Sequence, residues 1–202
     1  MAPTIRLALP GDVAAMLAIY AEVVRTSAIT FEYDPPSEAE FGERVATVGA
    51  KFPWLVYARD GEVLGYAYAT TWRARAAYEW SVETTVYVRD DVHRQGVGRG
   101  LYRSLIACLR LQGHRLAIGG ITLPNPASVG LHEACGFRLV GVHRACGHKQ
   151  GRWHDVGFWE LELAPRADAA PAPPVPPSSL VGTTAWEQAM ASGLGRTSPA
   201  HD

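Results

Sequence analysis

The chain has 202 residues, a formal net charge of −1 and a hydrophobic fraction of 48%. This length supports one domain with a substantial core, and the near balance of charges gives no electrostatic reason to expect a nucleic-acid or membrane partner. No apolar run is long enough to span a bilayer, and the first residues lack the basic and apolar regions of a signal peptide. Because Cys108, Cys135 and Cys146 cannot all pair within the chain, we expect a reducing, cytoplasmic setting.

The predicted elements alternate between strands and helices along most of the chain. In order, we predict a strand at 5–9, a helix after the N-cap Asp12, a helix from Glu38 behind the Ser37-x-x-Glu40 capping box, and a hairpin of 54–59 with 62–71. There follow a strand at 81–88, a helix at 101–111, a strand at 116–123, a short helix ending at Gly136, and a closing antiparallel pair at 137–145 and 153–163. This order predicts an α/β protein with a mixed sheet.

The composition changes after Leu163. Residues 165–179 are rich in Pro and Ala, which predicts a polyproline-like or disordered extension. Further on, Thr184-Ala185-Trp186-Glu187 offers a small capping box, and Trp186 and Met190 lie one helical turn apart. A short helix near 184–191 could therefore dock on the body or on a partner subunit. A frayed tail is the interpretation that we favour from sequence, because chain ends are commonly poorly ordered. We therefore expect a domain at 1–164 and an extension at 165–202.

One stretch carries most of the chemical information. In the strand at 81–88, Glu83, Thr85 and Tyr87 share one face while the valines share the other, so an acid can face a cleft. The turn His93-Arg94-Gln95-Gly96-Val97-Gly98 then opens a helix, and backbone N–H groups at a helix start favour phosphate. The glycine spacing fits neither a dinucleotide fingerprint nor a P-loop. A carboxylate beside a phosphate cradle indicates group transfer from a phosphate-bearing cofactor.

That turn resembles the acetyl-CoA loop of the GNAT N-acetyltransferases, Gln/Arg-x-x-Gly-x-Gly/Ala, with His93 in the first position. Further blocks across roughly 4–164 resemble the phosphinothricin and methionine sulfoximine N-acetyltransferases within that superfamily. These blocks are residues 52–56, 60–63, 72–78, 82–88, 132–134, 136–137 and 151–159. The resemblance implies a twisted, mostly antiparallel sheet flanked by helices with a splayed central strand pair, acetyl-CoA as cofactor, and a homodimer.

The resemblance also implies roles for individual residues. Glu83 is expected to be the general base that deprotonates the acceptor ammonium, although a strand glutamate facing solvent or paired with Arg75 is the structural alternative. A backbone N–H in the run Val86, Tyr87 and Val88 is expected to polarise the thioester carbonyl. The pyrophosphate is expected to lie among Arg94, Gln95, Gly96, Val97, Gly98 and Arg99, and the pantetheine arm beside Asn125.

His132 occupies the position at which many GNAT enzymes place a tyrosine that protonates the departing thiolate. A histidine there could act as an acid or an alternative base. Equally, it could be a partly buried helix residue bonded to a backbone carbonyl, because thiolates often leave with little help.

The acceptor implied by the resemblance is a glutamate-like amino acid, which needs cationic or N–H donors and aromatic walls. The candidate substrate-binding residues are Phe31, Arg73, Arg75, Tyr78, Thr85, Lys149, Trp153 and Trp159. Arg75 is the first choice for an anionic group, since a guanidinium can bind a carboxylate in bidentate fashion. Alternatively, each of these side chains could pack in the core or lie on the surface without binding a substrate.

Other functions compete with this one. His143, Cys146, His148 and His154 cluster in the sequence but lack zinc-site spacing, so we predict no metal. The alternatives to the amino-acid enzyme are a GNAT enzyme acting on another amine, such as a protein N-terminus or an aminoglycoside, and a non-catalytic acetyl-CoA sensor. Glu83 beside an intact glycine turn disfavours the sensor. The sequence does not identify the native acceptor.

Overall fold

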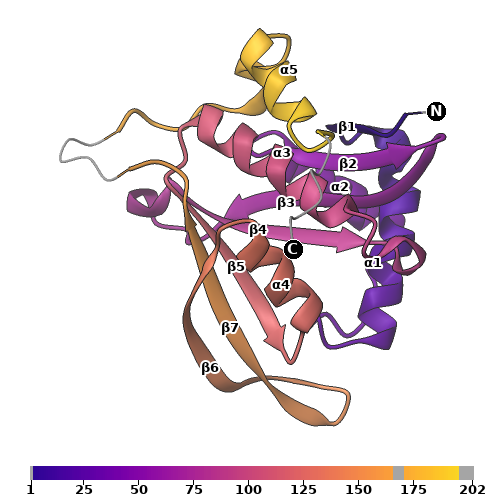
Figure 1. The fold of residues 1–202 in the computed structure, drawn as a ribbon. Helices are drawn as coiled ribbons and strands as arrows, with labels where there is room; N and C mark the ends of the chain where they lie inside the picture. Colours follow the sequence, from indigo (N-terminus) through magenta and orange to yellow (C-terminus); the bar gives the residue numbers. More distant parts are fainter. Residues whose placement is uncertain (1, 166–170, 196–202) are drawn as a thin grey trace, which may run out of the picture.

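The computed structural model describes residues 2–165 and 171–195, which form a seven-stranded sheet covered by helices on both faces (Figure 1). The strands, in spatial order, are β1 (Thr4–Leu7), β2 (Trp54–Arg59), β3 (Glu62–Thr71), β4 (Ser81–Val88), β5 (Leu116–Leu123), β7 (Arg152–Glu162) and β6 (Arg138–Lys149). The helices are α1 (Val13–Thr26), α2 (Glu38–Gly49), α3 (Val97–Gln112), α4 (Pro126–Ala134) and α5 (Thr184–Ala191). The predicted α/β class and mixed, mostly antiparallel sheet are confirmed.

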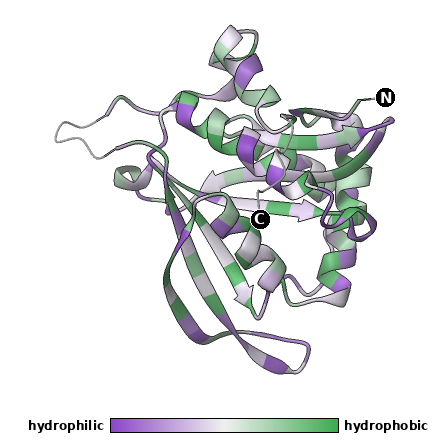
Figure 2. Ribbon diagram, viewed as in Figure 1, coloured by the Kyte–Doolittle hydropathy of each residue, from purple (hydrophilic) through white to green (hydrophobic). Residues whose placement is uncertain are grey.

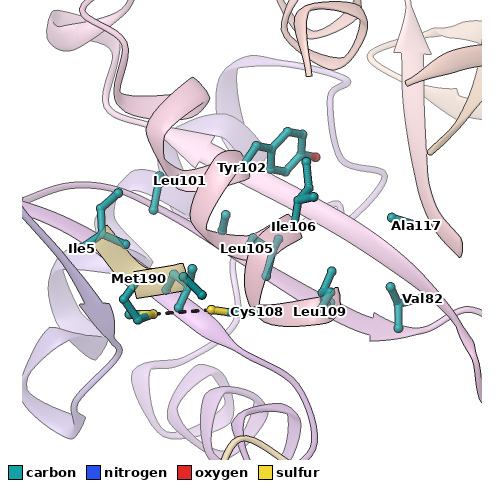
Figure 3. Packing of buried hydrophobic residues seen from close by; sticks show 14 of the residues in the cluster. Ile5, Val82, Leu101, Tyr102, Leu105, Ile106, Cys108, Leu109, Ala117 and Met190 are labelled. Atoms are coloured by element: carbon teal, nitrogen blue, oxygen red, sulfur yellow. Dashed lines mark hydrogen bonds between the residues drawn. The ribbon is translucent and has the colours of Figure 1, made fainter. Parts of the chain in front are cut away.

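Two hydrophobic clusters lie on opposite faces of the sheet. On the α3 face, defined by α3, α4 and α5, Leu101, Leu105 and Trp186 pack with Val82 of β4; Figure 3 shows part of this packing, with Cys108 against Met190. The α1 face, defined by α1 and α2, holds a second cluster, whose aromatic members are Tyr20, Phe41, Trp54 and Tyr66. In Figure 2 hydrophobic and hydrophilic residues recur along α3 and α5, as expected for helices that bury one side.

The central strands diverge where the sequence resemblance predicted a splay. The parallel strands β4 and β5 pair only over Ser81, Val82 and Glu83, opposite 116–118. Both strands continue beyond this point, and β4 keeps its antiparallel pairing with β3 as far as Val88. The β5-facing edge of β4 after Glu83 is therefore not used by that neighbour.

The C-terminal segment docks on the body of the protein. Ser104 in α3 donates a hydrogen bond to the Met190 carbonyl at 2.7 Å, and Gln112 bonds to the Val175 carbonyl at 2.7 Å. Trp186 is 2% exposed and belongs to the α3-face core. A frayed tail is therefore the wrong description of residues 171–195, because their apolar side chains complete a core. Residues 166–170 of the predicted polyproline-like stretch lie outside the described residues.

Local signals predicted the elements, but several bounds differ: β1 ends at Leu7 and not at residue 9, and α3 begins at Val97 and not at residue 101. Ser37 and Glu40 form the predicted capping box. Asp12 occupies the N-cap position of α1, but its carboxylate accepts hydrogen bonds from the Arg6 guanidinium and the Leu9 N–H instead of capping the helix. The closing hairpin of β6 and β7 is longer than predicted, because the strands pair as far as Lys149 and Arg152 through two irregular registers.

Candidate active site

Glu83 lies at the last residue of β4 that pairs with β5, and its side chain points to the α1 face with Thr85 and Tyr87. Its Oε1 atom is 3.4 Å from the place where a Cβ on Gly120 would lie, so the glycine leaves room for the carboxylate. Burial raises the pKa of Glu83, and the charge of Arg73 opposes this rise. The sequence named Arg75 as the structural partner, whereas Arg73 is the arginine whose charge acts on this carboxylate. A half-buried carboxylate with a raised pKa is a suitable general base near neutral pH.

Aromatic side chains that were not predicted as site residues surround this position. Phe158 of β7 approaches the same Gly120 position to 3.5 Å, and its ring lies 5.7 Å from Trp72 and 5.3 Å from His143. Tyr68 pairs in register with Thr85, and burial raises the pKa of Tyr68 to about 12, so its phenol stays protonated. The face alternation of β7 could have indicated Phe158, had the sequence shown which face was buried.

The glycine turn forms the start of α3 and suits a phosphate. Gly96 adopts a left-handed conformation, φ 83°, as the N-cap of α3, and no side chain caps the helix there. The N–H groups of the first helical turn therefore have no partner within the helix. A Cβ on Gly98 would lie 3.2 Å from the Leu131 side chain, so α4 packs closely against this turn. An open, uncapped helix start beside a splayed strand fits the pyrophosphate and arm of acetyl-CoA.

The other residues predicted to bind the cofactor lie in or beside this turn, and they differ in exposure and in their hydrogen bonds. Arg94 and Arg99 are exposed. Gln95 is held from both sides, accepting from Arg59 at 3.3 Å and donating to the Asp91 carbonyl at 3.3 Å. His93, the departure from the family pattern, places its Nε2 atom 3.1 Å from the Val88 carbonyl and so links the turn to the end of β4.

Asn125 stands at the opposite side of the strand opening, as the N-cap of α4. Its Oδ1 atom accepts a hydrogen bond from the Ser128 N–H at 3.0 Å. Because the side-chain oxygen of Asn125 caps the helix, the side-chain nitrogen remains to donate a hydrogen bond to a ligand.

His132 lies on the α3 face, opposite to Glu83, and is buried. Its Nδ1 atom is 2.8 Å from the Ser128 carbonyl, so this nitrogen is the donor and Nε2 accepts from the Tyr102 hydroxyl at 2.9 Å. Burial lowers the pKa of His132. A Cβ on Gly119 would lie 2.5 Å from Nε2, so the ring fills the space that this glycine leaves. This geometry supports the packing interpretation of His132, because both ring nitrogens already have partners.

The candidate substrate residues divide into separate groups. Arg73 and Thr85 are associated with Glu83, whereas Arg75 and Tyr78 lie on the loop between β3 and β4. Trp159 is buried in the α3-face core and donates to Glu133 at 3.4 Å. It therefore lies on the wrong face to line a pocket at Glu83.

The remaining three candidates belong to the β6–β7 hairpin or to the loop beside it. Lys149 is buried, and its ammonium donates to the carbonyls of Val24 at 2.7 Å and Thr30 at 2.9 Å. The Phe31 ring fills the space beside Gly147. Trp153 is largely exposed. Lys149 and Phe31 thus fasten the hairpin to the loop after α1, and Lys149 has two partners that a substrate would have to replace.

Neither a metal cluster nor a membrane-spanning helix is found among the described residues. Within 2–165 and 171–195, no group of three or more His, Cys, Asp or Glu side chains is arranged to hold a metal ion. No helix of that same part of the chain is long and apolar enough to cross a bilayer.

Comparisons with known proteins identify a matching family and several similar sequences and structures. Residues 5–157 match the acetyltransferase (GNAT) domain family. The chain is 41% identical over 172 residues to a phosphinothricin N-acetyltransferase of Streptomyces viridochromogenes, covering 85% of this chain and 91% of the relative. It is 37% identical over 175 residues to an L-methionine sulfoximine/L-methionine sulfone acetyltransferase of Pseudomonas paraeruginosa, covering 84% and 99%. A crystal structure of a phosphinothricin acetyltransferase from Sinorhizobium meliloti in complex with acetyl-CoA superposes with a TM-score of 0.81 at 36% identity, covering 85% and 94%.

Proposed function

Because this chain belongs to the GNAT family of acetyltransferases and uses acetyl-CoA, we propose that it acetylates the α-amine of a small glutamate-like amino acid, such as phosphinothricin or methionine sulfoximine. The observation that carries this proposal is the position of Glu83 at the point where β4 and β5 separate. There a carboxylate with a raised pKa adjoins the unused edge of β4. The names of the relatives supply the acceptor class.

Glu83 acts as the general base in this proposal. An amino acid arrives as an ammonium ion, and its nitrogen becomes a nucleophile only after a proton leaves. The raised pKa of Glu83 brings its basicity closer to that of the amine than an exposed carboxylate would. Removal of the proton, directly or through a water molecule, leaves a neutral amine beside the opening between the strands.

The backbone of β4 and the start of α3 hold the donor. Acetyl-CoA supplies the acetyl thioester when it is bound. The β5-facing edge from Val86 to Val88 offers backbone groups to the pantetheine arm and an N–H to the thioester oxygen. The uncapped first turn after Gly96 offers its N–H groups to the pyrophosphate, and Arg94 and Arg99 add positive charge.

Arg73 is the cation that we propose for the acidic group of the acceptor, with Phe158 and Trp72 as aromatic walls. The charge of Arg73 acts on Glu83, and its guanidinium lies 4.8 Å from the centre of the Trp72 ring. Arg75, the first choice from sequence, lies two residues further along the same loop between β3 and β4, and its charge is not among those that act on Glu83. A double-mutant cycle separates the two: an acceptor amide that lacks the carboxylate should lose about 1.5–3 kcal/mol of transition-state binding in the parent enzyme. The amide should lose almost no transition-state binding, relative to the parent acceptor, in the variant from which the carboxylate-binding arginine has been removed.

An acceptor screen tests the function itself. Purified protein with acetyl-CoA is offered phosphinothricin, methionine sulfoximine and the common amino acids, with an aminoglycoside and a short peptide as comparison acceptors, while free thiol is measured. We expect thiol release with the glutamate-like amino acids. Release only with the aminoglycoside or peptide would transfer the assignment to another GNAT acceptor class. No release with any amine, together with tight acetyl-CoA binding, would indicate a sensor.

We also propose that the protein acts as a homodimer in the cytoplasm. The assembly is an expectation from the family, and the compartment is consistent with three cysteines that are free in the structure. Light scattering of the purified chain measures the oligomeric state, and a mass of about 22 kDa, that of one chain of 21.9 kDa, would contradict the dimer.

A further inference from the structure

The C-terminal segment, residues 171–195, docks beside the part of α3 that we assign to the cofactor. α5 lies against α3 (Figure 1), and the chain after α5 continues along that helix toward its first turn. The match to the acetyltransferase domain ends at residue 157, so the segment lies outside the matched domain. A contact between the two can therefore add to the cofactor site something that the matched domain alone lacks.

Gly100 in α3 and Gly193 after α5 bring the two backbones into direct contact. A Cβ on Gly100 would lie 2.8 Å from the Gly193 carbonyl oxygen, and a Cβ on Gly193 would overlap the Gly100 carbonyl. Neither position has room for a side chain, so both glycines are needed for this approach. Ile5 of β1 lies against the same point. A displacement of the segment at Gly193 therefore acts directly on the backbone of Gly100.

Ser104, one turn further along α3, fixes the end of α5 by two hydrogen bonds. Its hydroxyl donates to the Met190 carbonyl at 2.7 Å and accepts from the Gly193 N–H at 3.1 Å. Ser104 is fully buried, and the Met190 carbonyl belongs to the last turn of α5, where carbonyls have no partner within the helix. Each bond satisfies a backbone group of the segment, and together they fix its position along α3.

Gly100 also closes the first turn of α3. Its N–H donates to the Gly96 carbonyl at 2.8 Å. The N–H groups of residues 97–99, which precede this bond, are the ones that have no partner within the helix. No side chain caps this end of α3, and helix ends without a cap fray more readily. The segment thus contacts the residue that keeps the proposed pyrophosphate donors in place.

We propose that Gly193 and Ser104 are positioning residues for acetyl-CoA. Through them the C-terminal segment holds the first turn of α3 in the conformation that receives the pyrophosphate. Without the docked segment this turn is ordered for only part of the time, and the affinity for acetyl-CoA falls by the fraction that remains competent. By linkage, acetyl-CoA stabilises the docked segment by the same factor. The inference rests on the pyrophosphate placement proposed above and on no property of the acceptor.

Gly193→Ala tests the proposal in the full-length chain, because its Cβ would overlap the Gly100 carbonyl and displace the segment. Calorimetry should show an acetyl-CoA affinity about tenfold or more below that of the parent protein. Gly195→Ala is the matched control: its Cβ would meet the Ser192 carbonyl oxygen at an ordinary 3.7 Å, and the affinity should not change. Val45→Ala, a core truncation in α2, lowers stability on the other face of the sheet and should also leave the affinity unchanged.

Ser104→Ala is a second variant that adds no bulk. It removes the hydroxyl that bonds to Met190 and Gly193, so the segment loses its anchor without a steric overlap. The acetyl-CoA affinity should fall by a smaller factor than in Gly193→Ala, about threefold. The double variant should lose less than the product of the two factors, because both changes release the same contact.

Hydrogen exchange supplies a readout that a merely structural role would not move. In the parent protein, saturating acetyl-CoA should slow the exchange of the backbone amides of 184–195 by the factor that Gly193→Ala removes from the affinity. In the absence of acetyl-CoA, the amides of 97–100 should exchange faster in Gly193→Ala than in Gly195→Ala. An acetyl-CoA affinity that Gly193→Ala leaves unchanged would overturn the proposal. Exchange in 184–195 that is the same with and without acetyl-CoA would also overturn it.

ADP separates this proposal from the placement of the pyrophosphate, because it carries a pyrophosphate without the pantetheine arm. ADP should shift the amide resonances of 97–99 in the ¹⁵N-labelled parent protein. Unmoved resonances would overturn both the placement and the positioning role. Moved resonances together with an unchanged acetyl-CoA affinity in Gly193→Ala would overturn the positioning role alone. Because no acetyl transfer is measured, failure of the proposed acceptor assignment would leave these results unaffected.

Discussion

His132 and Glu83, the two residues that the sequence analysis proposed as catalytic, lie on opposite faces of β5, beside Gly119 and Gly120. Their surroundings differ. On one face, His132 fills the space beside Gly119, with both ring nitrogens bonded and its surroundings closed by Tyr102 and Phe137. On the other, Glu83 lies beside Gly120 without a hydrogen bond to another side chain among the described residues, and with a raised pKa. One glycine thus makes room for a packed ring, and the adjacent one makes room for the carboxylate that we propose as the general base.

The two residues differ in whether their polar atoms already have protein partners. Both residues are partly desolvated, but the partners of His132 are protein atoms that a substrate would have to displace, whereas the carboxylate of Glu83 is available. We therefore expect substitutions on the α3 face to lower stability and substitutions around Glu83 to lower turnover. The predictions below test that division.

Replacing the carboxylate that we propose as the general base should have the largest effect. Glu83→Gln keeps the shape of the side chain but removes its basicity, so turnover should fall by about 10²- to 10⁴-fold with little change in acetyl-CoA affinity. Steady-state kinetics and calorimetry measure the two quantities. Near-normal turnover across neutral pH would remove Glu83 from the mechanism and end the functional contrast between the faces.

Removing a core side chain from the C-terminal segment should be the largest change on the α3 face. Trp186→Ala deletes a side chain that is 2% exposed, and such truncations cost about 3–5 kcal/mol of unfolding free energy. Urea unfolding measures the loss, and Val181→Asp in the same segment is the exposed control. An unchanged midpoint would mean that the segment does not dock in solution. In that case truncation after Leu163 would leave a folded, active enzyme, as the sequence alone suggests.

Local patterns in the sequence were sufficient for the main features of the site. Alternation in 81–88 placed Glu83 on the face opposite the buried Val82, and the glycines at 96 and 98 indicated the turn that opens α3, although the helix begins at Val97 and not at the predicted residue 101. Both signals depend on neighbouring residues. The splay came from the family resemblance, since no periodicity marks the point at which β5 leaves β4.

Long-range contacts account for what the sequence missed. Phe158 and Trp159 are adjacent aromatic residues, and a strand must send one to each face, but composition does not say which. Lys149 is a plausible anion-binding residue until its ammonium is seen to bond to carbonyls of Val24 and Thr30, more than 100 positions away. Likewise, the bond between Ser104 and Met190 that holds the C-terminal segment leaves no local signal.

A smaller effect is expected from the hydrogen bond between Tyr102 and His132. Tyr102→Phe leaves the Nε2 atom of His132 buried without its donor, which should cost about 1–3 kcal/mol of stability. His132→Leu should cost a similar amount by leaving the hydroxyl with a long contact to the Thr84 carbonyl at 3.5 Å. The double variant should lose less than the sum, because both changes break one interaction. If His132 acts as the thiolate acid, His132→Leu will instead lower turnover and alter the basic limb of the pH profile, while Tyr102→Phe will not.

The smallest and most specific change concerns the electrostatics of Glu83. Burial raises the pKa of this carboxyl and the charge of Arg73 lowers it, so Arg73→Gln removes the opposing influence. The pKa of Glu83 should then rise further, and since the base must be deprotonated to act, the acidic limb of kcat should move to higher pH. Measuring kcat at saturating acceptor separates this shift from weaker acceptor binding. Arg75→Gln is the matched control, because Glu83 shows no influence from its charge, and its limb should stay in place. A limb that moves to lower pH in Arg73→Gln, or equally in both variants, would show that the titrating base is not the carboxylate beside Gly120.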